Sequence, residues 1–307
     1  MLLMRLKSWL SNMYLFQQIE EIMVQNHDAK SVIAEFLLNE KEHLYQYTMD
    51  DIAHYTYTSK STLVRFAKAL GYKGWKDFSR ALIEEIKYQE NKQNTVDVNF
   101  PFLANDDYKK IINNIANLQI ESILDTVNLI DEKMLELAVM RLAKAKNIIL
   151  FGMRPNSYYA ESFRWKFLSI GKHIQIASYG EFGMLARTMN KDDLAILVSY
   201  SGNNTSKDPM AQVPILKQNN VMMIAMTSGG NNYLQQNIDC VFEISAQERL
   251  FSKISTFATE QSLLLIFNVI FACFFRKDYH RNLVYKIENS KELENQRRAT
   301  LKQLKEE

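Results

Sequence analysis

Cysteine is scarce in this chain, and no apolar run is long enough to cross a membrane. Only Cys240 and Cys273 occur among the 307 residues, too few for a disulfide framework or a zinc site. The longest apolar stretch, residues 262–275, contains Asn268 and is preceded by Glu260. It falls short of the eighteen or more residues expected of a membrane span. We therefore expect a buried helix there and no membrane partner.

Signals for export and for metal binding are also missing. The first residues, Met-Leu-Leu-Met-Arg-Leu-Lys, lack an apolar core followed by a small-residue cleavage site. The five histidines, at positions 27, 43, 54, 173 and 280, have no spacing typical of a metal site. We expect a cytoplasmic protein with no metal and no cofactor.

Net charge is small, but its distribution is uneven. The whole chain carries a formal charge of +2. Residues 30–58 hold two cations and five anions, whereas residues 59–80 hold six cations and one anion. The six cations are Lys60, Arg65, Lys68, Lys73, Lys76 and Arg80. One locally basic surface can therefore face a phosphate backbone and make binding salt-dependent.

The basic segment follows a pattern of two helices joined by a tight turn, over residues 48–75. Ser59 stands where an N-cap is needed, and Gly71 follows the last apolar position, as a residue just beyond a helix C-terminus should. The second helix is predicted over residues 60–70. Its exposed face would carry donors suited to phosphates and base edges. The predicted DNA-binding residues are Ser59, Lys60, Ser61, Thr62, Arg65, Lys68 and Lys73. The alternative is an ordinary helix pair with a solvated basic face.

The chain divides into four predicted segments. Residues 1–88 are helical by period and contain the helix pair. Residues 89–107 lose this period and are expected to be a linker. Residues 108–276 form the second domain, which starts with a helix over 108–129 whose apolar residues exceed one stripe. That helix is expected to pack on its own domain and on a second subunit. Residues 277–307 carry eight cations and six anions and are expected to form a charged helical tail.

From residue 135 the pattern alternates between strands and helices, which predicts a doubly wound parallel sheet. The predicted strands are 147–151, 174–178, 194–199, 221–227 and 240–244, and the helices between them are 157–170, 181–189, 204–219 and 231–237. The predicted fold class is thus an all-α helix-turn-helix N-terminal domain joined to an α/β C-terminal domain. In such sheets ligands bind beyond the carboxyl ends of the strands.

Two loops at those strand ends carry the candidate ligand-binding residues. The third strand leads into Ser199, Ser201, Gly202, Asn203, Asn204 and Thr205. Hydroxyls, a glycine and a following helix N-terminus would form a cradle for a phosphate. The first strand leads into Gly152, Arg154, Asn156 and Ser157. There Asn156 or Ser157 could cap the next helix, and Arg154 could supply a bidentate guanidinium. The simpler alternative is that these residues are only helix caps.

These motifs resemble a known family of bacterial transcription factors. Residues 48–75, with Ser-Thr-Leu-Val-Arg-Phe-Ala-Lys-Ala-Leu-Gly-Tyr-Lys-Gly-Trp at their core, resemble the DNA-binding domain of the RpiR family. Val-Ser-Tyr-Ser-Gly at residues 198–202 resembles the phosphate loop of the SIS (sugar isomerase) domain that follows it in that family. The resemblance covers residues 13–276. It implies a homo-oligomeric regulator of a carbohydrate operon that binds a double-stranded DNA operator and responds to a sugar phosphate.

The resemblance assigns roles by position and has three departures. Ser59 matches the cap of the recognition helix, Ser61, Thr62 and Arg65 match its DNA-facing positions, and Ser199, Ser201 and Gly202 match the phosphate loop. The family usually has glycine where this chain has Tyr57, for which a positive φ would be strained. The family's first loop usually reads Gly-x-Gly-x-Ser, but here Arg154 stands at the second glycine and Asn156 at the serine. Its phosphate loop usually continues Gly-x-Thr, but here two residues separate Gly202 from Thr205.

Two alternatives to a ligand-controlled regulator remain. The first is a sugar-phosphate isomerase, which would need a carboxylate or histidine at the sugar carbonyl. Glu181, Glu260 and His173 are the candidates, but they form no recognisable catalytic arrangement, so no catalytic residue is predicted. The second is a regulator whose SIS domain only oligomerises. The operator, the effector, and the choice between repressor and activator are left open by the sequence.

Overall fold

The computed structural model describes residues 15–25, 28–91, 96–245, 247–295, 297–298 and 300–301. The first fourteen residues, on which the expectation about export rests, lie outside the described residues. The chain forms two compact units, Met1–Asn114 with Gly229–Asn231, and Ile115–Ser228 with Asn232–Glu307. We describe each unit by itself.

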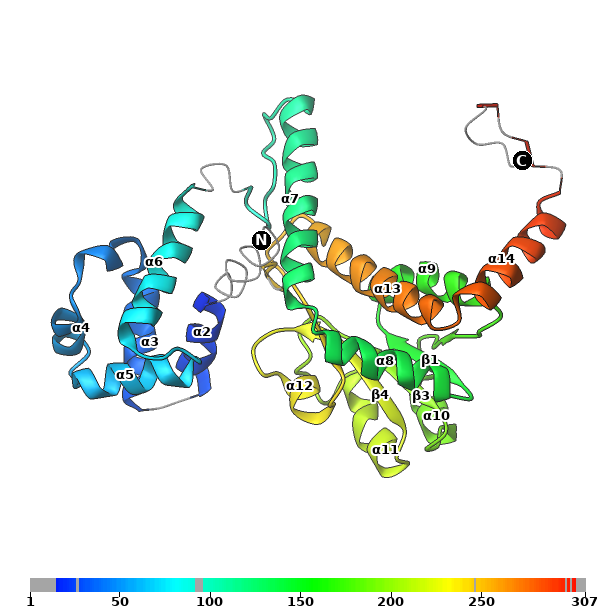
Figure 1. Ribbon diagram of the computed structural model, residues 1–307, viewed down its shortest axis with the longest axis horizontal. Coiled ribbons are helices and arrows are strands. Elements are labelled where there is room, and N and C mark those ends of the chain that lie inside the picture. The colour runs from blue at the N-terminus through cyan, green and yellow to red at the C-terminus, as the bar shows by residue number, and fades with distance from the viewer. Residues whose placement is uncertain are drawn as a thin grey trace. The chain divides into compact units, whose positions relative to one another are not determined.

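The described part of the first unit is helical up to the linker (Figure 1). Its elements are α2 (Leu15–Gln25), α3 (Ala29–Asn39), a 3₁₀ helix (Lys41–Gln46), α4 (Met49–Tyr55), α5 (Lys60–Ala69) and α6 (Trp75–Asn91). Their apolar stripes enclose one core, which includes Ile33, Leu37, Leu63, Phe66 and Phe78. Burying these stripes stabilises helices that would be marginal alone. The predicted helical domain is confirmed.

The second unit contains a parallel five-stranded sheet in the order β2-β1-β3-β4-β5. Its strands are β1 (Ile148–Gly152), β2 (Gln175–Ile176), β3 (Leu194–Val198), β4 (Met222–Ser228) and β5 (Val241–Ile244). The helices are α8 (Glu132–Lys144), α9 (Asn156–Leu168), α10 (Phe182–Thr188), α11 (Val213–Gln218), α12 (Tyr233–Asn237), α13 (Phe257–Lys277) and α14 (Tyr279–Leu293). The central strands β1 and β3 are buried along their whole length, because helices cover both faces. The predicted doubly wound fold is confirmed.

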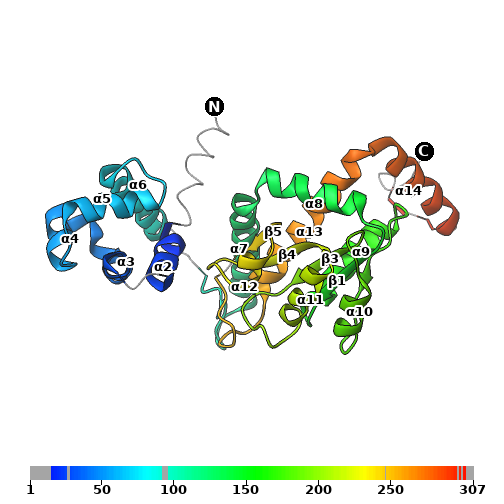
Figure 2. The same ribbon diagram turned by 90° about the horizontal axis from the view of Figure 1, so that it is seen from below.

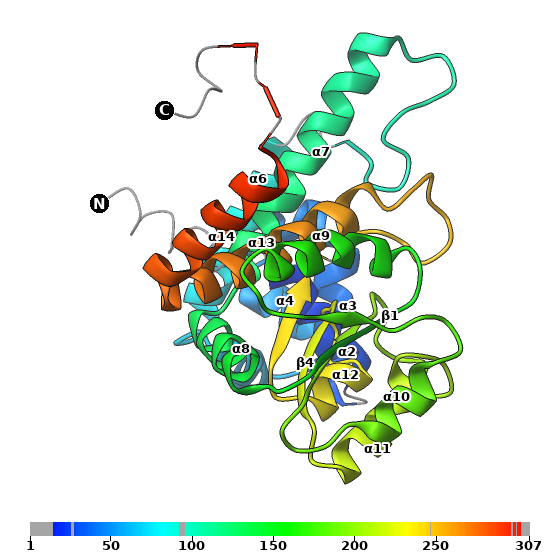
Figure 3. The same ribbon diagram turned by 90° about the vertical axis from the view of Figure 1, so that its right-hand side faces the viewer.

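Alternate residues of each strand enter two separate cores. Leu150, Ile196 and Ile224 point to the face covered by α8, α9 and α13. Phe151, Leu197 and Ala225 point to the face covered by α10, α11 and α12. Figure 3 shows α9 and α13 on one side of the strands and α10 and α11 on the other. The carboxyl ends of β1, β3 and β4 therefore open at one edge between two well-packed layers.

Helix α13 is the predicted buried helix, although it is longer than the apolar run. By length and composition it is the one helix in the described part of the chain that could cross a membrane. One of its faces packs on the sheet, and the buried residues are Ala258, Thr259, Ser262, Leu263, Ile266, Phe267 and Ile270. Over its most apolar 18 residues, 39% is buried within the protein. Helix α14 follows it directly towards the C-terminus (Figure 2).

Helix α7 (Tyr108–Leu129) belongs to both units, since the boundary falls between Asn114 and Ile115. Its lower half is attached to α13 mainly by polar contacts. Ser122 Oγ donates to the carbonyl of Ala258 at 2.6 Å, and Thr126 Oγ1 donates to Ser262 Oγ at 2.8 Å. Gln247 Nε2 donates to Asp125 Oδ2 at 2.7 Å. These hydrogen bonds, the first two of them buried, fix the C-terminal half of α7 on the rest of the second unit.

One predicted helix is wrong at its start. The sequence pattern placed a helix over 204–219, but residues 203–209 are irregular, and the first helical residues form a 3₁₀ turn, Met210–Gln212, before α11. Asn204 Oδ1 accepts from the backbone N–H and the hydroxyl of Ser206, and such local bonds compete with helix formation. Pro209 then restricts the backbone before the turn. The loop after β3 therefore does not lead straight into a helix.

Candidate functional site

The first candidate site is the exposed face of α5. Ser59 caps this helix as predicted, because its hydroxyl accepts from Thr62 N–H at 3.2 Å. Thr62 Oγ1 lies 3.0 Å from Ser59 Oγ and accepts from Arg65 Nη2 at 3.1 Å. The guanidinium is thus held at the end of a chain of hydroxyls on the helix surface. Ser59, Lys60, Ser61, Arg65, Lys68 and Lys73 are exposed, and Thr62 is half-buried.

The helix ends as the sequence predicted. Gly71 has a φ of +84°, and its N–H donates to the carbonyl of Lys68 at 3.0 Å. Tyr72 N–H donates to the carbonyl of Ala67 at 3.1 Å. This pair of bonds is a Schellman motif, which satisfies carbonyls that the last turn leaves free. The basic face therefore has a defined length of about three turns.

The turn before α5 contains the strained tyrosine that the sequence suggested. Tyr57 has a φ of +52° and is 94% exposed. A left-handed backbone costs about 1–2 kcal/mol in a residue with a Cβ. Thr56 Oγ1 and Thr58 Oγ1 lie 2.9 Å apart on either side of it, and Thr56 is buried. The folded helix pair imposes this turn on a residue type that does not favour it.

Helix α4 supports the same surface with opposite charge. Its first turn has a capping box, in which Thr48 and Asp51 satisfy each other's backbone N–H groups. This bonding lowers the pKa of the Asp51 carboxyl, chiefly through the Thr48 hydroxyl. Asp50 lies 2.6 Å from Lys60 Nζ in an exposed ion pair. Such pairs contribute little to stability, so Lys60 remains available to another anion.

The second candidate site lies at the carboxyl ends of β1 and β3. Gly152, the last residue of β1, is buried, and a Cβ added there would lie 3.5 Å from Val198 Cβ and 3.7 Å from Asn156 Cβ. Arg154 is exposed, with its guanidinium 5.3 Å from the centroid of the Tyr158 ring. The expected side-chain cap is wrong here, because Pro155 occupies the N-cap position and makes no side-chain bond. Asn156 and Ser157 are the first two residues of α9, where both are half-buried.

The loop after β3 is held by its own side chains. Ser199 is buried, and its Oγ accepts from Gly202 N–H at 3.3 Å. Gly202 has a φ of +61°, and an added Cβ would come closer than 3.0 Å to Asn232 Oδ1 and Thr227 Oγ1. Glycine is therefore required by the neighbouring strand and helix, in addition to any approach of a ligand.

Two residues predicted to bind the effector have structural partners. Asn203 Oδ1 accepts from Tyr233 N–H at 3.0 Å, in the first turn of α12. Asn204 is tied to Ser206 as described above. Ser201 is half-buried and Thr205 is exposed. The predicted cradle of helix N–H groups after β3 is wrong, since no helix starts there. The donors that this loop can offer to a ligand are its hydroxyls and its own backbone N–H groups.

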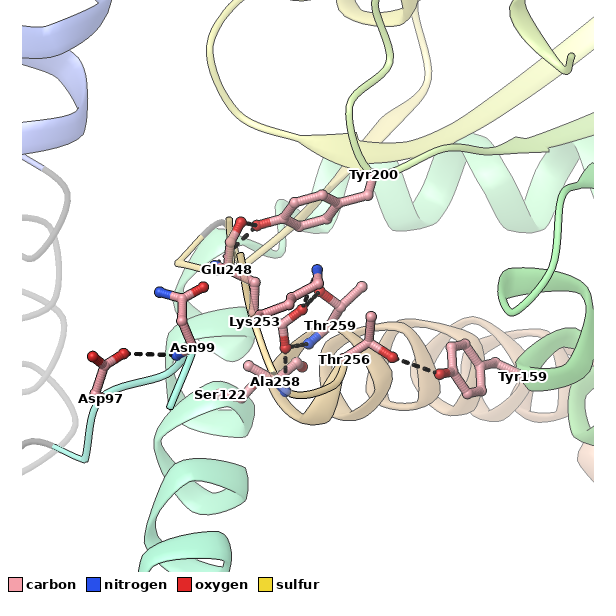
Figure 4. Close-up of polar contacts among 10 residues, drawn as sticks. All are labelled: Asp97, Asn99, Ser122, Tyr159, Tyr200, Glu248, Lys253, Thr256, Ala258 and Thr259. Carbon is pink, nitrogen blue, oxygen red and sulfur yellow. Dashed lines mark hydrogen bonds and ion pairs between the residues drawn. The ribbon is translucent and has the colours of Figure 1, made fainter. Parts of the chain in front are cut away.

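A buried carboxylate next to this loop was missed by the sequence analysis. Glu248 lies between β5 and α13, and its side chain has 0% exposure. Its Oε1 accepts from Ala258 N–H at 2.7 Å and from Thr259 N–H at 3.1 Å (Figure 4). Its Oε2 accepts from Thr259 Oγ1 at 2.7 Å and from Lys253 Nζ at 3.0 Å. Glu248 thus caps α13 from ten residues away, a spacing for which no sequence signature exists.

Tyr200 connects this carboxylate segment to the loop after β3. Its hydroxyl donates to the carbonyl of Glu248 and accepts from Glu248 N–H (Figure 4). Burial, with a smaller contribution from the Glu248 charge, raises the pKa of Tyr200 to about 12. Lys253 Nζ lies 5.2 Å from the centroid of the Tyr200 ring. Nearby, Tyr159 and Thr256 bring their hydroxyl oxygens to 2.9 Å and join α9 to the start of α13.

The candidate acid and base groups do not gather at this site. Glu181 precedes α10, and its Oε2 accepts from Ser178 N–H at 3.1 Å. Glu260 lies in the first turn of α13. His173 precedes β2 and so lies at the opposite end of the sheet from the loops. Within the described ranges, no three His, Cys, Asp or Glu residues are grouped to hold a metal ion.

Comparisons with known proteins agree with this architecture. Residues 13–89 match the model of the helix-turn-helix domain of the rpiR family, and residues 141–267 match the SIS domain. An uncharacterised HTH-type transcriptional regulator of Haemophilus influenzae is 28% identical over 65% of this chain and 68% of its own length. These matches define a transcriptional regulator with a helix-turn-helix domain followed by a SIS domain.

Solved structures show the same fold. The Vibrio vulnificus NanR protein, complexed with ManNAc-6P, has a TM-score of 0.57 and 21% identity, covering 93% of this chain and 100% of its own. A putative sugar-phosphate isomerase of Listeria monocytogenes has a TM-score of 0.51 and 19% identity, covering 62% and 99%. With both domain matches in their order, the chain is a member of the RpiR family.

Proposed function

We propose that this regulator controls a carbohydrate operon by binding operator DNA through α5 and a sugar phosphate at the loops after β1 and β3. Ser59, Thr62 and Arg65 form one hydrogen-bonded row on α5, which supports the DNA-binding role most directly. Hydroxyls and arginine are the groups that commonly contact phosphates and base edges. The same chain contains a SIS domain, and a structural neighbour was solved with ManNAc-6P.

A sensor explains the second unit better than an isomerase does. Both oxygens of the buried Glu248 are already occupied by donors from α13 and Lys253. Glu181 accepts a backbone N–H, and His173 lies at the far end of the sheet. None of these three groups is therefore placed as a free base beside the loops, as proton transfer would require. The function in this unit is binding without turnover.

Self-association is part of the same proposal. Helix α7 has exposed apolar side chains, namely Ile112, Ile120, Ile123, Leu124 and Val127. An apolar face of this kind marks an interaction surface. A second copy of the chain would present two α5 helices to half-sites related by two-fold symmetry.

The test starts from DNA selection, because the operator is unknown. The full-length protein is used to enrich double-stranded oligonucleotides from a random pool, and the affinity for the enriched site is measured by fluorescence anisotropy. We expect a two-fold symmetric site whose affinity changes at least five-fold when one of a panel of sugar phosphates is added, ManNAc-6P included. A regulatory coupling of about 1–3 kcal/mol corresponds to such a change. An enriched site with no response to any sugar phosphate would leave only the DNA-binding and oligomerising roles.

A further inference from the structure

The loops at the carboxyl ends of the strands contain few cations. Residues 199–205 include no Lys or Arg. Arg154 lies in the loop after β1 and Lys207 follows the loop after β3, and both are exposed. Lys253 lies in the segment between β5 and α13, and only 12% of its side chain is exposed. It is therefore the most shielded cation near these loops, and a charge in that position interacts more strongly than one in water.

The surroundings of Lys253 leave it able to meet a second anion. Glu248 receives three further donors besides Lys253, two of them N–H groups at the positive end of α13. The Glu248 carboxylate is thus compensated without depending on Lys253 alone. The Lys253 ammonium has three N–H donors, and among the described residues Glu248 is the acceptor found for it. The ammonium also lies over the ring of Tyr200.

Tyr200 fixes where that ammonium is. The ammonium lies 5.2 Å from the ring centroid of Tyr200, and Tyr200 stands between Ser199 and Ser201 in the chain. The same tyrosine is bonded through its hydroxyl to both backbone groups of Glu248. Glu248 and Tyr200 together therefore hold the ammonium over the Tyr200 ring, and Tyr200 belongs to the loop that carries the two serines.

We infer that Lys253 is the cation that recognises the anionic group of the effector, while Glu248 and Tyr200 are positioning residues. This inference rests on the proposed function, because it needs an anionic ligand at the loop after β3. Hydrogen bonds to a charged group are about twice as strong as neutral ones. The ligand class it selects is a phosphorylated sugar in preference to the same sugar without phosphate.

The test compares two ligands on full-length variants. Isothermal titration calorimetry measures the affinity of wild type, Lys253→Met and Lys207→Met for ManNAc-6P and for ManNAc. Any other sugar phosphate that stabilises the wild-type protein is tested in the same way, paired with its unphosphorylated sugar. We expect Lys253→Met to weaken the phosphorylated ligand at least ten-fold and to leave the free sugar within about two-fold, as one charge-assisted contact implies. Lys207→Met is the matched control and should bind both ligands as wild type does. Lys253→Arg should retain most of the preference for phosphate.

A second variant covers the risk that Lys253→Met disturbs folding. Glu248→Gln with Lys253→Met replaces the buried ion pair by neutral groups of similar size, and the glutamine carbonyl can still accept from Ala258 and Thr259. It should show the same loss of phosphate preference. If both variants keep the wild-type preference while Ser199→Ala with Ser201→Ala abolishes binding, the inference is wrong and the proposed sensor stands. If both ligands weaken equally in the two variants, Lys253 is structural and the inference is likewise wrong. If no sugar phosphate binds the wild type, the proposed function fails, and the inference fails with it.

Discussion

The hydroxyl of Tyr200 donates to the carbonyl of Glu248 at 2.7 Å and accepts from the N–H of the same residue at 3.1 Å. One side chain in the loop after β3 thus satisfies both backbone groups of a residue that precedes α13. Glu248 is buried and belongs to an irregular segment. Its backbone would otherwise lack the partners that a strand or helix provides. The bond makes the loop and the start of α13 one connected structure.

Tyr200→Phe should therefore destabilise the second unit. The substitution leaves two backbone groups of Glu248 without their partner, at a cost of about 1–3 kcal/mol. Thermal unfolding followed by circular dichroism measures the effect. Tyr179→Phe is the control, because Tyr179 is 85% exposed, and its melting temperature should match wild type. Equal melting temperatures for both variants would mean that water replaces the hydroxyl without loss.

Arg65→Ala and Thr62→Ala should each abolish specific binding to the enriched DNA site while the fold stays intact. A lost base contact costs about 1–3 kcal/mol. Thr62→Ala also frees the Arg65 guanidinium, which loses the acceptor that holds it. Arg187→Ala, an exposed arginine of the second unit, serves as the control in the same anisotropy titration. Unchanged affinity in both α5 variants would remove this helix from the recognition role.

Tyr57→Gly should stabilise the helix pair, because glycine adopts a φ of +52° without strain. The relief of about 1–2 kcal/mol is partly offset by the extra chain entropy of glycine, about 0.5–1 kcal/mol. A net gain of about 0.5–1 kcal/mol should appear in chemical denaturation. Tyr57→Ala keeps the Cβ and should show no gain. Equal free energies of unfolding for Tyr57→Ala and Tyr57→Gly would contradict this prediction, because they would show that the backbone strain at residue 57 is not relieved by glycine.

Gly202→Ala should damage the loop after β3 far more than Gly180→Ala damages the loop after β2. Both glycines have a positive φ, +61° and +91° respectively, so both substitutions bring backbone strain of about 1–2 kcal/mol. Only at Gly202 would the new Cβ also collide with Asn232 and Thr227, whereas nothing lies within 4 Å at Gly180. Melting temperatures and the response to sugar phosphate should both fall further in Gly202→Ala. Similar losses in the two variants would contradict this explanation.

Ile120→Glu with Leu124→Glu should dissociate the proposed oligomer. Both side chains are 55% exposed on α7, so the change is tolerated in a monomer but buries charge in an interface. Light scattering on the full chain at micromolar concentration should give a dimer or larger species for wild type and a monomer for the variant. Met184→Glu alters an equally apolar exposed residue on α10 and should not change the mass. A monomeric wild type would refute the assembly.

Strands β1, β3 and β4 could be predicted because each is largely an apolar run, whereas the strand expected over residues 174–178 is only Gln175–Ile176. Helix α5 could also be predicted, because its cap at Ser59 and terminal Gly71 are local signals. The helix predicted to start at residue 204 is wrong at its start, because the helical spacing of apolar residues continues through residues whose side chains form local hydrogen bonds, as Asn204 and Ser206 do. The backbone conformation of this segment is set by side-chain hydrogen bonds, which the pattern of apolar residues does not reveal.

The contacts around Glu248 could not be predicted, because each joins residues that approach only in the folded chain. Tyr200 is 48 positions from Glu248, and the two touch because β3 and the segment after β5 end at one edge of the sheet. The strain at Tyr57, by contrast, could be predicted, because a tyrosine stands at a turn position where the backbone favours glycine. Local geometry is readable from the sequence, whereas the surroundings of a loop depend on topology.

Helix α7 is one continuous helix whose first seven residues fall in the first unit and whose remaining residues fall in the second. Its 22 residues extend about 33 Å at 1.5 Å per residue. Ser122 is bonded to the carbonyl of Ala258, whose own N–H is bonded to Glu248. The lower turns of α7 thus rest on the helix start that the Glu248 carboxylate caps. A tilt of α7 by about 10° about its C-terminal end would displace its N-terminal end, at Tyr108, by about 6 Å.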